Sequence, residues 1–163
     1  MARTVYVGLI SDTHGLMRPE ALTALRHSDL IIHCGDIGDP AVLAALGKLA
    51  PVRAIRGNND NGARASKLPT SAVVEVAGHT IYVLHNLGEL DLDTAAAGCS
   101  VVASGHSHKP AVQKRGDVLL VNPGSAGPRR FSLPVTVGRL ALRTDRCDAE
   151  IVPLSVSQPA RKK

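Results

Sequence analysis

The chain has 163 residues, which is the size of one domain and enough to bury a substantial hydrophobic core. Hydrophobic residues make up 44% and charged residues 20%, a balance typical of soluble globular proteins. Only 2% of the residues are aromatic and none is Trp, so the core must be aliphatic and a base-stacking surface for single-stranded nucleic acid is not expected. The formal net charge of +5 would favour anionic partners. Part of it lies in residues 158–163, which we interpret as a basic, disordered tail after a single domain at 1–157.

Neither a membrane span nor a disulfide framework is expected. The longest apolar stretch near the start, Val5–Ile10, is too short to cross a bilayer, and no targeting motif is evident. The three cysteines, Cys34, Cys99 and Cys147, are an odd number without a close pair, which fits a reducing compartment. We therefore predict a cytoplasmic protein without disulfides, in which no cysteine is catalytic.

The first third of the chain alternates between strands and helices. Buried strands are predicted at Val5–Ile10, Asp29–His33 and Val52–Ile55. One helix is predicted from Pro19 to about His27. A second begins at Pro40 and places Val42, Leu43, Leu46 and Leu49 on one face. This β-α-β-α-β order implies a parallel sheet with right-handed crossovers.

The remainder of the chain is rich in strands. Hairpins are predicted for Val73–Val76 with Thr80–Leu84, around Ala77-Gly78-His79, and for Ala111–Lys114 with Val118–Val121, around Arg115-Gly116-Asp117. A short helix is expected at Leu90–Ala97, and further strands at Val101–Ser104, Val135–Leu142 and Glu150–Leu154. Two sheets packed face to face, with helices outside, would bury so many strands, although periodicity alone does not establish that arrangement.

Polar segments directly follow several of these strands. They are Ser11-Asp12-Thr13-His14, Gly35-Asp36, Gly57-Asn58-Asn59-Asp60 and Gly105-His106-Ser107-His108, and His85 ends a further strand. Sites in α/β sheets assemble at strand ends, and imidazole nitrogen, carboxylate oxygen and amide oxygen suit Mn, Fe, Zn, Ni or Co. Each segment alone is a weak signal, but the set in this order predicts a metal site.

The local spacing suggests how these side chains converge. In Asp12-x-His14 and His106-x-His108, alternate positions would point to one side of an extended backbone. A glycine precedes Asp36, Asn58 and His106, and it would let the backbone turn sharply toward a crowded centre.

With these motifs the chain resembles the calcineurin-like metallophosphoesterase superfamily, and especially its small bacterial and archaeal phosphodiesterases, from Val5 to about Gly124. The resemblance implies an α/β fold, a four-layer α/β/β/α sandwich of two mixed β-sheets flanked by helices. It also implies a dinuclear metal centre. In that centre Asp12, His14 and His108 would hold one metal, Asn58, His85 and His106 would hold the other, and Asp36 would bridge both.

The activity implied by the resemblance is metal-dependent hydrolysis of phosphate esters, above all phosphodiesters, by attack of a metal-bridging hydroxide. Asp36, Asn58 and His85 are the expected catalytic residues. Two divalent transition metals are expected as cofactors, with Mn²⁺ first and Fe, Ni, Zn, Co or Mg as alternatives. The expected partner is a small phosphate-ester substrate. No membrane is expected, nucleic acid is disfavoured, and homo-oligomer formation is left open.

Two other functions stay open. A nuclease or nucleotidase could use the same centre; the scarcity of aromatics and the lack of a second domain weigh against a dedicated nuclease, but not against small nucleotides. A protein-interaction scaffold is the second alternative, because a eukaryotic retromer subunit is similar in fold with a degraded metal centre. Competent ligands at all seven positions argue against that scaffold here.

Other residues near the motifs are expected to support the site or to lie on the surface. Asn59 stands where many family members have a His that protonates the leaving group, and an amide cannot act as a general acid near neutral pH. His33 is expected to pack beside the site, Asp60 to orient a ligand histidine, and His79 to lie on the surface. Arg129-Arg130 could meet substrate phosphate, but exposed surface arginines are the favoured interpretation.

A further segment, Asn122-Pro123-Gly124-Ser125, also resembles one of the small phosphodiesterases. Its Pro-Gly pair equally indicates a tight turn after the strand that precedes it, and the segment can serve in both ways.

Overall fold

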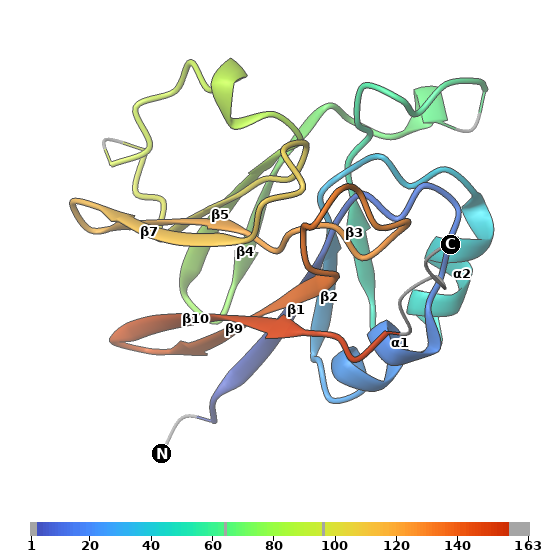
Figure 1. Cartoon of the computed structure of the whole chain (residues 1–163). Helices are drawn as coiled ribbons and strands as arrows, with labels where there is room; N and C mark the ends of the chain where they lie inside the picture. The colour runs from blue at the N-terminus through green and yellow to red at the C-terminus, as the bar shows by residue number, and fades with distance from the viewer. Residues whose placement is uncertain (1–2, 64, 96, 157–163) are drawn as a thin grey trace, which may run out of the picture.

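A computed structural model describes residues 3–63, 65–95 and 97–156 (Figure 1). Its ten strands are β1 (Val5–Ile10), β2 (Leu30–His33), β3 (Val52–Ala54), β4 (Ser71–Val76), β5 (His79–Leu84), β6 (Val101–Ala103), β7 (Ala111–Arg115), β8 (Val118–Asn122), β9 (Thr136–Arg143) and β10 (Arg146–Pro153). Two α-helices, α1 (Pro19–Leu25) and α2 (Pro40–Gly47), and two 3₁₀ turns, η1 (Ala65–Lys67) and η2 (Leu87–Glu89), complete the described elements. The predicted tail at 158–163 lies outside the described residues.

The first sheet has the strand order β10-β9-β1-β2-β3 and confirms the predicted β-α-β-α-β opening. Strand β1 pairs in parallel with β2, and β2 with β3, while β9 runs antiparallel on the other side of β1. The last strand was predicted to begin at Glu150 but begins at Arg146, because β9 and β10 form one long hairpin paired from Arg143↔Arg146 to Thr136↔Pro153. Helices α1 and α2 cover the outer face of this sheet (Figure 1).

The second sheet has the order β4-β5-β6-β8-β7 and contains both predicted hairpins. The β4–β5 turn is shorter than predicted, since only Ala77 and Gly78 connect the strands and both have positive φ, as a tight two-residue hairpin turn requires. His79 belongs to β5, and its prediction as a surface residue is wrong. The residue is 9% exposed, and its ring bonds the Ser100 hydroxyl and the Arg143 carbonyl oxygen, so it ties this sheet to β9 of the first.

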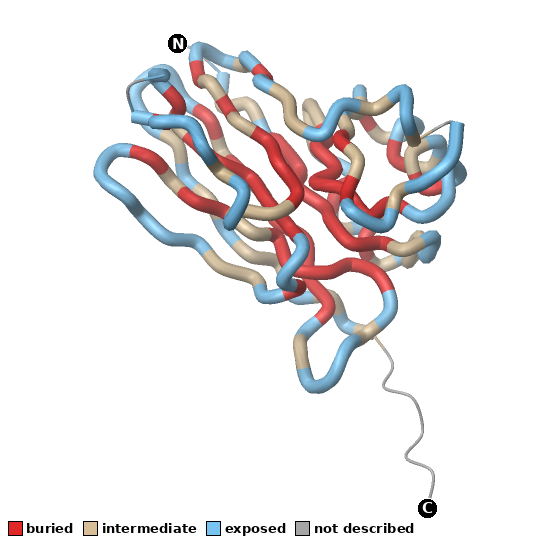
Figure 2. Tube along the Cα trace, turned by 90° about the horizontal axis from the view of Figure 1, so that it is seen from above, coloured by how far each residue is buried: buried red, intermediate tan, exposed pale blue. Residues whose placement is uncertain are grey.

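An aliphatic core fills the space between the sheets, as the composition predicted. Fully buried side chains include Leu9 and Ile32 of the first sheet and Ile81 and Val101 of the second. Figure 2 shows this buried band running through the middle of the strands, with exposed loops at their ends. The predicted sandwich of two mixed sheets is thereby confirmed.

The predicted helix at Leu90–Ala97 is wrong. Among its described residues the chain forms only turns, in which the Ala97 amide donates to the Asp93 carbonyl oxygen and the Cys99 amide to the Thr94 carbonyl oxygen. Leu87 and Leu90 nevertheless pack on the outer face of the second sheet, so this segment and η2 cover it in place of a long helix.

No helix among the described residues is long and apolar enough to cross a membrane. The cytoplasmic location stays a prediction.

Candidate metal centre

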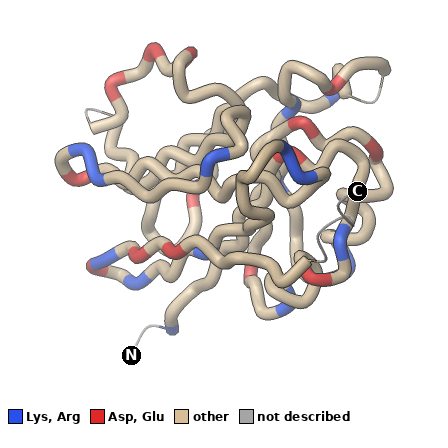
Figure 3. The backbone as a smooth tube through the Cα atoms, viewed as in Figure 1, with Lys and Arg blue, Asp and Glu red and all other residues tan. Residues whose placement is uncertain are grey.

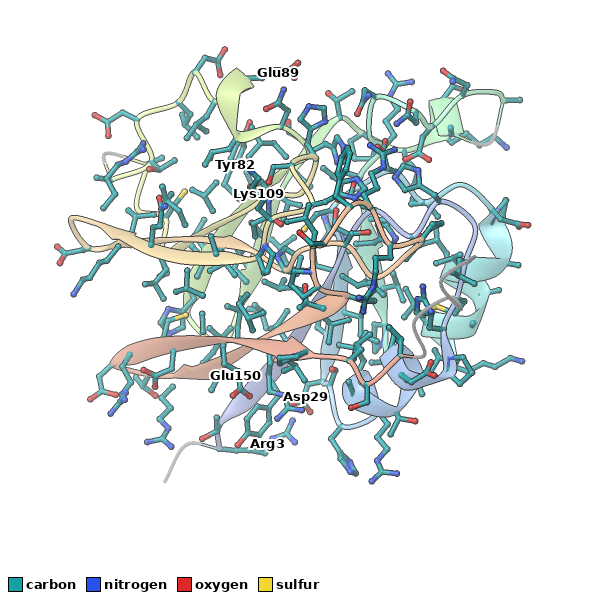
Figure 4. The ribbon with its side chains drawn as sticks, in the orientation of Figure 1. Arg3, Asp29, Tyr82, Glu89, Lys109 and Glu150 are labelled. Atoms are coloured by element: carbon teal, nitrogen blue, oxygen red, sulfur yellow. The ribbon has the colours of Figure 1, made fainter. Side chains whose placement is uncertain are left out.

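All the predicted ligand segments lie at one end of the sandwich. Backbone hydrogen bonds join them: the Asp12 amide donates to the Gly35 carbonyl, the His14 amide to the Asp36 carbonyl, and the Gly105 amide to the His85 carbonyl. In Figure 4, Glu89, which lines a cavity together with His85 and His106, lies at this end of the molecule. The ion pair between Arg3 and Asp29 lies at the opposite end.

The carboxylate of Asp12 is fully buried and its two oxygens have different surroundings. Oδ2 accepts hydrogen bonds from the Ser11 hydroxyl at 2.8 Å and from the His106 amide at 3.1 Å. Oδ1 has no such donor and lies 3.4 Å from His108 Nε2, 3.7 Å from His85 Nε2 and 3.9 Å from His14 Nε2. One oxygen is thus held by the protein while the other is presented to three imidazoles.

Asp36 lies opposite, and Asn59 holds it through both of its oxygens. The Asn59 backbone amide donates to Oδ1 and its side-chain amide to Oδ2, each at 2.9 Å. Oδ2 also lies 3.3 Å from His85 Nε2 and 3.9 Å from His14 Nε2. Burial alone would raise the pKa of Asp36, but the close contact with the His85 imidazole and the hydrogen bonds from Asn59 outweigh burial and hold that pKa well below its usual range. The side chain is therefore a carboxylate at neutral pH.

The orientation of His85 suits a metal ligand. Its Nδ1 bonds the Cys34 carbonyl oxygen at 2.7 Å, so Nδ1 carries the proton and Nε2 is left facing the two carboxylates. Burial lowers its pKa, but the contacts with Asp36 and the Cys34 carbonyl prevail and the net shift is upward. Since Nε2 is the atom beside both carboxylates, a proton or a metal ion would compete for the same position.

Two groups of ligand atoms come within 4.8 Å of one another: Asp12 with His14 and His108, and Asp12 with Asp36 and His85. The first matches the predicted half-site, and the second joins both carboxylates to one predicted ligand of the other half-site. Four buried side-chain atoms here have no hydrogen-bond partner among the described residues: Asp12 Oδ1, His14 Nε2, His85 Nε2 and His108 Nδ1. Two of these nitrogens, His14 Nε2 and His85 Nε2, lie within 3.9 Å of Asp12 Oδ1, and divalent cations bound among these ligand atoms would satisfy them.

The remaining two candidates, Asn58 and His106, lie at the exposed side of this cluster. The Asn58 Oδ1 is 3.3 Å from His106 Nδ1, and the rings of His85 and His106 meet edge to face at 5.2 Å. The structure thus brings all seven predicted residues together, five of them in or next to the buried groups and two at the rim.

The backbone at the site differs from the extended conformation predicted. Five of the seven candidate ligands have positive φ, namely Asp12, His14, Asp36, His106 and His108. Left-handed backbone is uncommon for non-glycine residues and concentrates at functional sites. The expectation of alternating positions on an extended strand is therefore wrong, because each side chain points inward from a left-handed turn.

The glycines before the ligands have two different roles. Gly35 has φ +101°, which agrees with the predicted sharp turn. Gly57 and Gly105 have no such φ. A side chain at Gly57 would overlap Asp36, and one at Gly105 would overlap Ser11 and Asp12, so these two are needed for close approach.

The model of the calcineurin-like phosphoesterase superfamily domain matches residues 5–145. The chain belongs to this superfamily. It is 34% identical to a probable metallophosphoesterase of Methanothermobacter thermautotrophicus, over 90% of this chain and 91% of the relative, and 27% identical to a phosphodiesterase of Methanocaldococcus jannaschii, over 82% and 91%. Among solved structures it resembles an archaeal phosphodiesterase with TM-score 0.75 at 24% identity, covering 91% of this chain and 100% of that one. Vacuolar Protein Sorting 29 of Cryptosporidium parvum has the same fold, with TM-score 0.72 at 18% identity, covering 94% and 99%.

Behind the ligands of this phosphoesterase domain lies a buried polar layer. Gly35 N–H donates to His33 Nδ1 at 3.1 Å, His33 Nε2 is 3.0 Å from the Thr13 hydroxyl, and that hydroxyl donates to the Ile37 carbonyl at 2.8 Å. His33 thus packs beside the site as predicted. Sequence reasoning missed Thr13, although its place between two ligands was a usable signal.

Asp60 was expected to orient a ligand histidine, and that prediction is wrong. Its carboxylate accepts hydrogen bonds from the backbone amides of Ile37, Gly38 and Gly57, at 2.8 to 3.2 Å. It therefore fixes the loops that carry Asp36 and Asn58 to one another.

The segment from Asn122 to Ser125 supports the site from the second sheet. The Asn122 side-chain amide donates to the Gly105 carbonyl at 3.0 Å, and the Ser125 hydroxyl donates to the Asp12 carbonyl at 3.0 Å. Gly124 has positive φ, as the predicted tight turn requires. The segment is both a turn and a brace for two ligand loops.

Proposed function

We propose that this chain is a metal-dependent phosphodiesterase that hydrolyses small phosphate esters, with two divalent metal ions held by the seven residues described above. The cluster of buried, orphaned ligand atoms around Asp12 is the observation that supports this proposal most strongly. Asp12, His14 and His108 would hold one ion, Asn58, His85 and His106 the other, and Asp36 would contact both. Manganese is the first candidate, since it suits mixed nitrogen and oxygen ligands, with Fe, Ni, Zn, Co and Mg as alternatives.

Two divalent ions at such a site would polarise the phosphate, lower the pKa of water and offset developing negative charge. The protein's part is to hold the ligands in place and in the correct protonation state. Asn59 keeps Asp36 ionised, the Cys34 carbonyl sets the tautomer of His85, and the Ser11 hydroxyl turns the free oxygen of Asp12 inward. Because each ligand is fixed by a neighbour, little reorganisation is needed when substrate binds.

The room beside the centre favours a small substrate. A cavity of about 440 Å³ is lined by Asn58, His85 and His106 and by further residues that include Arg56 and Thr70. This volume is in the range of small-molecule sites. It accommodates a phosphate together with a modest alcohol group and suits a phosphodiester of low molecular mass.

Asn59 gives the reaction a particular leaving-group dependence. Its side-chain amide already donates to Asp36 and has no proton to release near neutral pH. The leaving oxygen would then depart as an anion or take a proton from water. Esters of acidic alcohols should react much faster than alkyl esters.

Two alternatives have less support. A nuclease or nucleotidase would use the same ligands, and only its substrate would differ. A protein-interaction scaffold is suggested by the likeness to Vacuolar Protein Sorting 29, but at 18% identity that likeness concerns the fold alone. The complete ligand set, whose two carboxylates are buried, favours catalysis over a scaffold.

The test is reconstitution of the metal-free protein with each candidate metal, followed by a panel of aryl diesters, phosphomonoesters, cyclic nucleotides and dinucleotides. Two metals per chain by elemental analysis and activity on diesters are expected. Asp36→Asn should lose the activity, whereas Asp29→Asn, an acid at the far end of the molecule, should keep it. Binding of one metal or none, or equal activity in both variants, would contradict the proposal.

A further inference from the structure

The loop between β8 and β9 lies against the first half-site. At its start Gly127 is buried so closely against the carbonyls of Asp12 and Thr13 that a side chain there would overlap them. The guanidinium of Arg18 holds the same point with two hydrogen bonds to the Gly127 carbonyl, at 3.2 and 3.3 Å. At its end Val135 forms a bridge with Ser125, whose hydroxyl donates to the Asp12 carbonyl. Both ends of the loop are therefore fixed to the site.

The tip of this loop carries an aromatic ring that the fold does not use. Phe131 is the only Phe in the chain, and 94% of it is exposed. Burying such a ring would stabilise the folded chain, yet the fold leaves it exposed. Its φ of +53° is a left-handed conformation that is unfavourable for a bulky residue, and the Leu133 amide closes the turn by donating to the Arg130 carbonyl. The turn thus presents the ring to solvent.

The neighbours of the ring are charged. Figure 3 shows basic residues on this loop, and Arg130 immediately precedes Phe131. The positive charge of Arg130 acts on the imidazole of His108, one of the proposed ligands. Arg130 therefore lies within electrostatic reach of the ligand cluster, and it would attract an anion bound there.

These observations point to a small ligand. An aromatic face beside a cation and a metal centre matches a molecule with a planar ring and a phosphate group. A protein partner is less well matched, because Phe131 stands between the exposed polar residues Arg130 and Ser132.

We propose that Phe131 stacks on an aromatic ring of the phosphate-ester substrate while Arg130 attracts its phosphate, an inference that rests on the proposed function. The ring is that of an aryl group or of a nucleobase. Phe131 thus selects aromatic esters over alkyl esters.

The experiment is calorimetric titration of the Mn²⁺-loaded full chain with two matched pairs of ligands. Phenylphosphonate and methylphosphonate differ by a phenyl ring, and adenosine 5′-monophosphate and ribose 5-phosphate differ by a nucleobase. Phe131→Ala should weaken binding of a ring-bearing ligand by about 2- to 10-fold and leave its ring-free partner unchanged. Phe131→Tyr should restore the affinity. Val73→Ala, which truncates an exposed side chain on β4, should change neither.

The pair that responds to Phe131→Ala identifies the ring as aryl or nucleobase. Unchanged affinities in Phe131→Ala for all four ligands, or no binding of any of them, would overturn the proposal. A change in sedimentation coefficient without a change in ligand affinity would also overturn it, since Phe131 would then be a contact between copies of the chain. If ring-dependent binding is found but no ester is hydrolysed, the recognition role stands and the catalytic proposal fails.

Discussion

Acid sensitivity of folding is expected to depend on one buried histidine, His33. Its Nδ1 accepts a hydrogen bond from Gly35 N–H, so Nε2 must carry the proton and donate it to Thr13. A second proton on the ring would break the bond to Gly35 and bury a positive charge. Burial is the main reason that the pKa of His33 falls to about 3; nearby Asp60 opposes the shift and His85 adds to it.

The size of the effect follows from proton linkage. In the unfolded chain His33 titrates near its usual pKa of about 6.5, whereas in the folded chain it stays neutral until about pH 3. Between these values the unfolded state binds the extra proton, so stability falls as the pH falls through this window. The loss relative to pH 8 is roughly 1 kcal/mol at pH 5.5 and roughly 3 kcal/mol at pH 4.5.

The assay is urea unfolding of the metal-free protein at pH 8, 5.5 and 4.5. His33→Gln cannot be protonated and should lose roughly 3 kcal/mol less between pH 8 and 4.5 than the unmodified chain does. The comparison is made within each variant, so a general loss of stability from the substitution cancels. His27→Gln, at an exposed histidine, is the matched control and should retain the original pH dependence. Equal pH dependence in His33→Gln and the unmodified chain would refute the reasoning.

Three further predictions concern the centre itself. Asp36→Asn should lose more metal and more activity than Asn58→Ala, because Asp36 faces two histidines with a charged oxygen whereas Asn58 offers one neutral oxygen. Elemental analysis and kcat/KM of the two variants test this prediction. Near-normal values of both for Asp36→Asn would be incompatible with a bridging role. Gly105→Ala should weaken metal binding about 10- to 100-fold, since its Cβ would overlap the carboxylate beneath it, while Gly47→Ala, with open space around it, should bind metal normally in the same titration. Asn59→His should accelerate esters with poor leaving groups selectively, by at most about 10²–10⁴-fold; an original rate that hardly varies with leaving-group pKa would mean that a proton donor is already present.

The sequence was informative wherever the chain repeats a simple period. The strands from Val5 to Ala54 and the two hairpins of the second sheet were predictable because apolar runs bounded by Gly and Pro allow few alternatives. The prediction of a helix at Leu90–Ala97 was wrong because it relied on the helix propensity of the alanines in this segment. Asp91, Asp93 and Thr94 bond readily to nearby backbone, and together with Gly98 they leave only turns.

The residues of the site could be predicted from the sequence, but the backbone conformation that orients them could not. Motif order and residue type indicated which side chains converge, since strand ends share one edge of each sheet. The left-handed backbone at Asp12 and His14 was not visible in the spacing, because it depends on hydrogen bonds to Gly35 and Asp36 from another strand. The bonds of Asp60 and the burial of His79 have the same origin in tertiary contacts.

The two half-sites differ in how firmly the protein prepares them. Around Asp12 the ligands are largely buried, and two of them are held through the atom that does not face the centre, by the bonds from Ser11 to Asp12 and from His85 to the Cys34 carbonyl. Asn58 and His106 are exposed, and their contact at 3.3 Å is with each other. Ordering an exposed side chain costs conformational entropy that a buried, bonded ligand has already lost on folding. The ion near Asp12, His14 and His108 should therefore bind more tightly than the ion that depends on Asn58 and His106.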